Sequence, residues 1–118
     1  MSKNRKRAEL AGRRAETRAA LFLQLKAYVI LERRYKTKLG EIDLIARRGN
    51  VIIFIEVKHR KSLDAGLYAV SPAQTRRIDA AANLYMAQMR GSDSYERRND
   101  IIVIGARALP HHIKDAWR

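Results

Sequence analysis

The chain has 118 residues, enough for one compact domain with its own hydrophobic core, and it contains no cysteine. Disulfides and thiolate metal sites are therefore excluded, and no apolar run approaches the roughly 18–20 residues that a membrane-spanning helix needs. The formal net charge of +13 predicts attraction to a polyanion, nucleic acid first and an anionic membrane surface second. We therefore expect a soluble, cytoplasmic protein that binds nucleic acid, in the first place DNA, and no membrane.

The N-terminal part combines a basic segment with a helix. Residues 1–7 are expected to form a disordered basic arm, either a solvated tail or a nucleic-acid contact, in front of a single domain over residues 8–118. Alanine, leucine, arginine and glutamate favour a helix from about Ala8 to Lys26. Glu16 is the single acid in a stripe of small and apolar residues on that helix. It is either drawn inward to a partner or pairs at the surface with arginine neighbours.

Three strands are expected next. Tyr28 to Tyr35 is rich in β-branched and aromatic residues, and the runs Glu41 to Arg48 and Val51 to His59 flank the pair Gly49-Asn50. A Gly-Asn pair between two such runs predicts a two-residue hairpin loop. The second run is apolar on both faces at its start, which predicts a central position in the sheet.

The hairpin register brings charged side chains together. Counting back from the loop, Asp43 lies opposite Glu56 and Glu41 opposite Lys58, with all four on one face. Directly opposed Cβ atoms are roughly 4.5–5.5 Å apart. Two carboxylates at this spacing repel each other unless a cation or a proton lies between them.

This acidic pair predicts a divalent-metal site for phosphodiester chemistry. Asp43 and Glu56 could hold Mg²⁺ or Mn²⁺, which prefer carboxylate, water and phosphate oxygens. Lys58 could position a water or neutralise charge on the phosphate, Glu16 could reach the ion directly or through water, and Glu41 could orient Lys58. The alternative is an exposed cross-strand cluster of ion pairs.

The second half of the chain adds a helix and a strand. Residues 60–70 are expected to form a loop, either a lid over the acids or a plain connection. Ser71 and Pro72 open a helix with a typical cap, and its first turns favour an anion such as phosphate. A polar loop over residues 92–99 and a strand over residues 100–105 follow, and the tail docks through Ile113, Ala116 and Trp117. The basic and polar residues expected to contact nucleic acid are Arg13, Arg14, Arg60, Lys61, Gln74, Arg76 and Arg77.

The element order is α-β-β-β-α-β, which predicts an α/β fold with a mixed sheet of about four strands flanked by helices. The second helix lies between two strands, as in a β-α-β crossover.

Two sequence blocks carry a family resemblance. The block over residues 40–46, Gly-Glu-Ile-Asp-Leu-Ile-Ala, and the block over residues 55–60, Ile-Glu-Val-Lys-His-Arg, resemble the signature of the bacterial UPF0102 (YraN-like) family. That family is similar to the PD-(D/E)XK, or restriction-endonuclease-like, nucleases, and among these to archaeal Holliday-junction resolvases. Residues 12–16, 71–81 and 113–117 resemble further parts of the family pattern.

The resemblance implies a restriction-endonuclease-like core, a Mg²⁺ or Mn²⁺ cofactor and a possible homodimer. By position, Glu16, Asp43, Glu56 and Lys58 match the acid, aspartate, glutamate and lysine of these nucleases, and the nearby Gln74 a residue on their following helix. The chain departs from the family at two positions: Ala27 stands where glycine is usual, and Arg34 stands where asparagine is common. A left-handed backbone at Ala27 would cost about 1–2 kcal/mol.

Three functions remain open from the sequence. The first is a Mg²⁺-dependent endonuclease acting on structured DNA, and the second is a nucleic-acid-binding module that keeps the fold without cleaving. The third is a basic ribosome-associated or membrane-surface protein, which needs no acids on the hairpin. The net charge of +13 fits all three, so only the acids discriminate between them.

Overall fold

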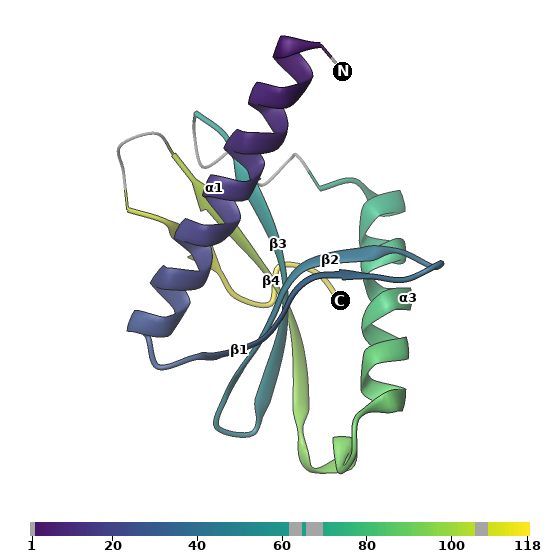
Figure 1. The fold of residues 1–118 in the computed structure, drawn as a ribbon. Coiled ribbons are helices and arrows are strands. Elements are labelled where there is room, and N and C mark those ends of the chain that lie inside the picture. Colours follow the sequence, from purple (N-terminus) through teal and green to yellow (C-terminus); the bar gives the residue numbers. More distant parts are fainter. Residues whose placement is uncertain (1, 62–64, 66–69, 106–108) are drawn as a thin grey trace.

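The computed structural model describes residues 2–61, 65, 70–105 and 109–118. Its two long helices stand on either side of a sheet, in the expected order α-β-β-β-α-β followed by one more short strand (Figure 1). The elements are α1 (Lys3–Leu25), β1 (Val29–Lys36), β2 (Glu41–Arg48), β3 (Val51–His59), α3 (Pro72–Gln88), the 3-10 turn η1 (Ser92–Ser94), β4 (Glu96–Ile104) and β5 (His111–Ile113).

The sheet is mixed and has five strands in the spatial order β1-β2-β3-β4-β5. Neighbouring strands are antiparallel except β3 and β4, which run parallel and are joined through α3. The predicted α/β class and crossover are thus confirmed. The fifth strand is the difference: the tail was expected only to dock, and residues 111–113 instead pair with β4.

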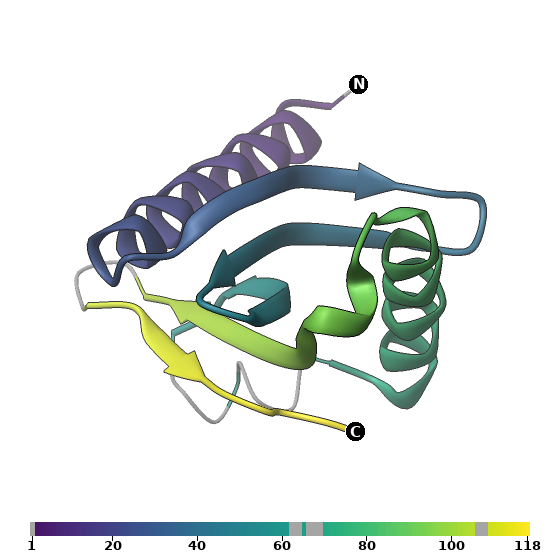
Figure 2. The same ribbon diagram turned by 90° about the horizontal axis from the view of Figure 1, so that it is seen from below.

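Each face of the sheet is covered by one helix (Figure 2). On β3, Ile53 and Ile55 belong to the core beneath α1, whereas Ile52 and Phe54 belong to the core beneath α3. All four side chains are fully buried, which confirms the expected central position of this strand. Burial on both faces therefore fixes the strand that carries Glu56.

The hairpin register agrees with the sequence up to the acids. Arg48 pairs with Val51, as predicted, and the ladder continues to the pair of Leu44 and Ile55. It ends there, one position before Asp43 and Glu56 would pair. Side-chain alternation also breaks at this point, because Leu44 belongs to the core under α1 while Ile42 belongs to the core under α3. The strand β2 thus turns away from β3 at Asp43, and the expected pairing of Glu41 with Lys58 lies outside the ladder.

Two other boundaries differ from the sequence prediction. The arm expected to be disordered is helical from Lys3, where the Ser2 side chain caps the helix by accepting a hydrogen bond from the Arg5 N–H. Lysine, arginine, alanine and leucine all favour a helix, so a cap at Ser2 is enough to extend α1. The predicted polar loop over residues 92–99 is also wrong in its second half, because β4 begins at Glu96.

The tip of the β1–β2 hairpin packs directly on α3. A Cβ atom on Gly40 would lie 2.3 Å from the carbonyl oxygen of Arg77, a distance that no side chain can occupy. Glycine is therefore required where the hairpin meets the first turns of α3. The Ser71 side chain caps α3 by accepting from the Gln74 N–H, which confirms the predicted helix start.

Two remaining sequence expectations concern the loop and the membrane. Most of the segment over residues 60–70 lies outside the described residues, so its expected role as a lid stays a prediction. Among the residues that are described, no helix combines the length and the apolar character needed to cross a membrane.

Candidate functional site

Asp43 and Glu56 lie together where β2 leaves β3. Both side chains line two adjoining hollows, of about 260 Å³ and about 390 Å³. Asp43 is half-buried and Glu56 is buried, and the Asp43 carboxylate accepts a hydrogen bond from the Val57 N–H at 2.8 Å. The bend in β2 therefore replaces a ladder hydrogen bond with a side-chain one, and it holds the two acids at a shared corner.

The electrostatics of Asp43 reflect this crowding. Burial is the largest cause that raises the pKa of its carboxyl, and the charges of Glu56 and Glu16 raise it further. The Val57 N–H and the Lys58 ammonium act in the opposite direction, and the resulting pKa is about 8. A proton or another cation is thus needed at this corner at neutral pH.

Lys58 supplies one such positive charge. Its Nζ lies 3.2 Å from Glu56 Oε1, and the two side chains are only 12% and 10% exposed. Burial raises the pKa of Glu56, while this ion pair lowers it. The sequence expected Lys58 beside the acids, and the structure brings it to Glu56 on its own strand.

Glu16 lines the larger of the two hollows together with Asp43 and Glu56. Its Oε2 accepts a hydrogen bond from Arg34 Nε at 2.8 Å, and the Glu16 side chain is 11% exposed. The helix does draw Glu16 inward, as one of the two sequence alternatives stated. Its partner is an arginine of β1 rather than a neighbour on α1.

The walls of the hollows come from distant segments. The smaller hollow is closed by Glu41 of β2 and by Gln74, Arg77 and Ile78 of α3. The larger one is walled on one side by small residues of α1 and on the other by the end of β3, followed by Arg60. A third hollow, of about 260 Å³, shares Ala11, Ala15 and His59 with it and is lined also by Arg14 and Arg18. The hollows therefore adjoin in a row with the acids between the first and the second.

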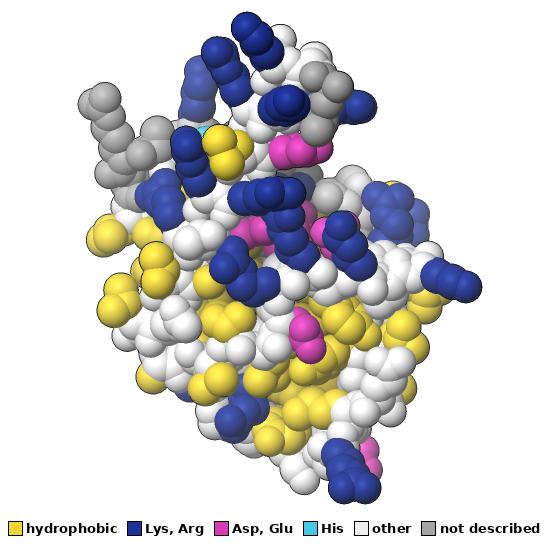
Figure 3. Space-filling model, in the orientation of Figure 1, with side chains coloured by type: hydrophobic (Ala, Val, Ile, Leu, Met, Phe, Trp, Pro, Cys, Tyr) yellow, Lys and Arg dark blue, Asp and Glu magenta, His cyan; other side chains and the backbone are white. Residues whose placement is uncertain are grey.

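Positive charge borders this row. In Figure 3, Lys and Arg side chains surround the acidic side chains below the N-terminal helix. Of the residues expected to contact nucleic acid, Arg14, Arg60, Gln74 and Arg77 line a hollow. Arg13, Lys61 and Arg76 are exposed but line none of the three.

The donor set at the corner fits a small divalent ion held by two carboxylates. Mg²⁺ is commonly bound through one or two carboxylates, with water and substrate phosphate completing its shell. Asp43 and Glu56 provide such hard oxygen ligands, and Lys58 pairs with Glu56 but leaves the crowding that raises the pKa of Asp43. Across the described part of the chain, no three His, Cys, Asp or Glu side chains gather closely enough to hold a metal. The fit is thus to a two-carboxylate site, without Glu16.

Arg34 and Gly40 are the residues here whose roles the sequence did not reveal. Arg34 appeared only as a departure from the family pattern, and Gly40 only as one letter of a motif. The backbone of Arg34 has a positive φ of 54°, which the sequence did not indicate. Ala27, the other position that departs from the family pattern, has a φ of 68°. Asparagine and glycine, which the family resemblance led us to expect at these two positions, tolerate this conformation best.

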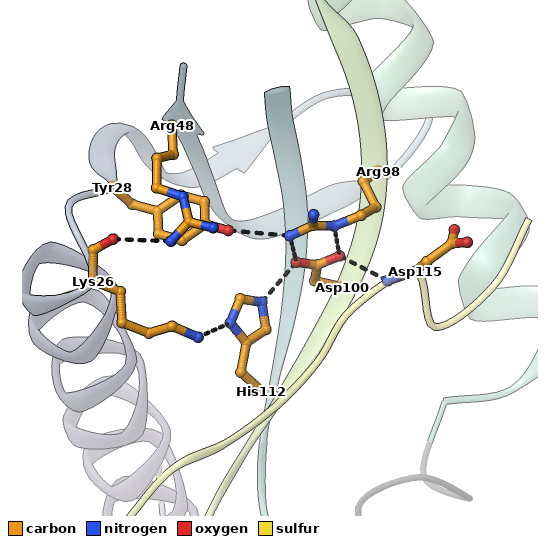
Figure 4. Close-up of polar contacts among 7 residues, drawn as sticks. All are labelled: Lys26, Tyr28, Arg48, Arg98, Asp100, His112 and Asp115. Atoms are coloured by element: carbon orange, nitrogen blue, oxygen red, sulfur yellow. Dashed lines mark hydrogen bonds and ion pairs between the residues drawn. The ribbon is translucent and has the colours of Figure 1, made fainter. Parts of the chain in front are cut away.

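A second polar cluster lies around Asp100 and is separate in its residues from the acids above (Figure 4). The fully buried Asp100 carboxylate accepts from Arg98, from His112 Nε2 at 2.6 Å and from the Asp115 N–H at 3.0 Å. Lys26 Nζ lies 2.9 Å from the other ring nitrogen, Nδ1, of His112. A charged lysine can only donate, so Nδ1 accepts and Nε2 carries the proton. The hydrogen bonds of this cluster link the C-terminal strand β5 to β4 and to Lys26, directly after α1.

The family profile and the similar proteins all point to one protein family. A sequence profile of the uncharacterised protein family UPF0102 matches residues 15–104. A UPF0102 protein of Bartonella bacilliformis is 46% identical over 112 residues, which cover 95% of this chain and 92% of the relative. One of Agrobacterium fabrum is 46% identical over 116 residues, covering 98% and 95%, and one of Bradyrhizobium diazoefficiens is 48% identical over 103 residues, covering 87% and 77%. The chain with the acid-bearing hairpin is therefore a member of the UPF0102 family.

Proposed function

We propose that this protein is a metal-dependent endonuclease that hydrolyses phosphodiester bonds in structured DNA. The observation that carries the proposal is the meeting of Asp43 and Glu56 at one corner of a row of hollows, with Lys58 3.2 Å from Glu56. Acids are costly to bury together unless they bind a cation or a proton, and the surface of the protein is strongly basic around them. DNA in a bacterial cell lies in the cytoplasm, where this activity would be exercised.

Each residue around the acids has a separate proposed role. Asp43 and Glu56 would hold Mg²⁺ or Mn²⁺, which when bound polarises a phosphate oxygen and lowers the pKa of a coordinated water. Lys58 balances the charge of Glu56 and presents its ammonium to a phosphate or a water in the larger hollow. Gln74 and Arg77 offer donors to the backbone of a strand on one side of the acids, and Arg60 does so on the other.

The decisive test is the variant Asp43→Asn. Purified protein is assayed against single-stranded, duplex, flapped and four-way-junction DNA with Mg²⁺, Mn²⁺ or EDTA. We expect metal-dependent cleavage by the wild type, at least 100-fold slower cleavage by the variant, in line with the loss of one electrostatic catalytic group, and nearly unchanged DNA binding. Asp93→Asn, in the exposed turn η1, is the matched control and should cleave like the wild type. Cleavage by Asp43→Asn at the wild-type rate would remove the site from the mechanism.

A nucleic-acid-binding module without cleavage is the second candidate. The observation in its favour is that Glu16 is bonded to Arg34, which leaves two carboxylates for an ion. This candidate predicts binding whose affinity falls steeply with added salt, no cleavage with either metal, and no effect of Asp43→Asn. Binding to anionic lipid vesicles in place of DNA would favour the membrane-surface alternative instead. Sedimentation of the free and DNA-bound protein tests the expected homodimer.

A further inference from the structure

Arg34 occupies an unusual place in β1. The neighbouring positions pair Arg33 with Leu44 and Tyr35 with Ile42, so Arg34 stands across from Asp43. Its φ of 54° is in the left-handed region, which is unfavourable for a residue with a Cβ atom. The strand β1 continues through Arg34, but no pair of Arg34 with β2 is formed beside Asp43.

The guanidinium of Arg34 is set among the acids. Arg34 Nε donates to Glu16 Oε2 at 2.8 Å, and the pKa of Arg34 is raised first by this hydrogen bond and further by the charges of Glu16, Glu41 and Asp43. Its side chain is 36% exposed, whereas that of Glu16 is 11% exposed. Arg34 therefore reaches from the molecular surface into the acidic cluster and fixes one positive charge there.

Glu16 has two possible cationic partners. It lines the same hollow as Asp43 and Glu56, so an ion held by those two would lie within the space that Glu16 borders. The Arg34 guanidinium places its positive charge at this carboxylate, so Arg34 and such an ion compete for Glu16. A charge-assisted hydrogen bond to a mostly buried carboxylate is among the stronger side-chain contacts.

We propose that Arg34 is an internal competitor of the divalent ion: it holds Glu16 away from the metal and thereby weakens metal binding at Asp43 and Glu56. The inference rests on the proposed function for the presence of a metal site. Release of Glu16 from Arg34 completes a three-carboxylate set, and the Arg34–Glu16 contact thus controls how tightly the ion is held. Arg34 is a positioning residue, since it acts on the ion through Glu16.

A structural role for Arg34 makes a different prediction. If the ion pair only fastens α1 to β1, its removal lowers the stability of the fold and leaves metal affinity unchanged. A general charge effect is also distinct, because loss of any nearby arginine would then strengthen cation binding equally. Arg33 supplies the control for both, since it is exposed, adjacent in β1, and donates to the Thr17 hydroxyl rather than to an acid.

The experiment measures Mn²⁺ binding to the free protein by electron paramagnetic resonance of the unbound ion. The variants are Arg34→Asn, chosen because asparagine tolerates positive φ, Arg33→Asn and Glu16→Gln, together with the double variant Glu16→Gln/Arg34→Asn. We expect Arg34→Asn to bind Mn²⁺ about tenfold more tightly than Arg33→Asn. In the Glu16→Gln background, Arg34→Asn should give little or no gain.

The outcomes separate this inference from the proposed function. If Arg34→Asn binds Mn²⁺ as tightly as Arg33→Asn does, or more weakly, Arg34 does not compete with the ion. The proposed two-carboxylate site is not affected by that result. A gain that persists in the Glu16→Gln background shows a charge effect and also overturns the competition. Absence of Mn²⁺ binding in the wild type and in Arg34→Asn defeats both proposals. Arg34→Gly replaces Arg34→Asn if circular dichroism shows that the asparagine variant is unfolded.

Discussion

At the scale of single residues, the acid corner depends on neighbours that balance its charge. Asp43 is stabilised by the Val57 N–H, Glu56 by Lys58 and Glu16 by Arg34, so each acid has a different donor. Lys58 also lowers the pKa of Asp43, but its ion pair is with Glu56. Loss of any one donor should therefore affect one carboxylate more than the others.

Lys58 gives the first prediction at this scale. Lys58→Met keeps the length of the side chain but removes its charge, so a developing negative charge on a bound phosphate loses its partner. We expect cleavage to slow roughly 100-fold, while Mn²⁺ binds at least as tightly as in the wild type. Single-turnover kinetics and metal titration measure the two effects separately. Lys114→Met, at an exposed position after β5, should change neither.

Ala27 gives the second prediction for a single residue. Its φ of 68° is in the left-handed region, the condition under which alanine is expected to be unfavourable here. Ala27→Gly should raise the free energy of unfolding by about 0.5–1 kcal/mol, the relief of backbone strain less the added freedom of the unfolded chain. Urea denaturation measures the change. Ala87→Gly, at an exposed position within α3, should have the opposite sign, so an equal effect of both variants would contradict the argument.

At the scale of elements, the hollows depend on how the hairpin tip meets α3. Gly40 lies against the carbonyl of Arg77, and the same approach brings Glu41 beside Gln74 in the smaller hollow. The Thr37 hydroxyl supports the turn by accepting from the Leu39 and Gly40 N–H groups at 3.0 Å. The position of one wall of the site is therefore set by a single close contact between two elements.

Gly40→Ala tests this contact. The added methyl group would have to displace either the hairpin tip or the first turns of α3, and overpacking of this kind typically costs about 1–3 kcal/mol. Thermal unfolding measures the loss, and DNA affinity should fall because Gln74 and Arg77 shift from the acids. The matched control is Gly12→Ala: nothing lies within 4 Å of the added Cβ, and the residue is inside α1, so it should be stabilising.

At the scale of the whole molecule, the Asp100 cluster connects the C-terminal strand β5 with β4 and with Lys26 at the end of α1. Burial alone would raise the pKa of Asp100, but hydrogen bonds from Arg98, His112 and the Asp115 N–H hold it down at about 2. Because α1, β4 and β5 all contribute, the protonation state of one carboxyl affects segments far apart in sequence. The cluster contributes to cohesion of the fold rather than to the candidate chemistry.

The stability of the fold should accordingly depend on acid pH. A carboxyl whose pKa is lower in the folded state binds its proton more readily in the unfolded state, so it stabilises the fold above pH 4. This contribution, roughly 2 kcal/mol for a shift from 3.8 to about 2, is lost as the pH falls through that interval. Urea denaturation between pH 6 and pH 2 measures it. Asp100→Asn should be less stable at pH 6 and should lack this part of the pH dependence.

The sequence was sufficient for the features that depend on local order. Gly49-Asn50 and the flanking alternation predicted both hairpin strands with their observed bounds, and the register then placed Asp43 near Glu56. The bend in β2 at Asp43 was not predictable from that pattern, because it follows from packing of the hairpin tip on α3.

Contacts between distant segments account for the features that the sequence did not predict. The start of β4 was assigned to a loop because Glu96 and Arg97 are charged, yet Arg97 lies over the Phe54 ring at 5.2 Å and Arg98 donates to the Tyr28 hydroxyl. The strand β5 is only three residues long and carries two histidines, one of which is fixed by Asp100. The partnership of Arg34 with Glu16 similarly joins β1 to α1, and no local pattern indicates it.

The placement of both hairpin acids on one contiguous segment has a consequence for how relatives can diverge. Both acids lie on the segment over residues 41–59, whereas much of the lining of the two hollows around them is supplied by α1 and α3. If the proposed function holds, substitutions in the two helices can thus change ligand preference while the two acids of the candidate site are inherited unchanged. Exchange of α3 surface residues between two relatives should transfer substrate choice without abolishing turnover.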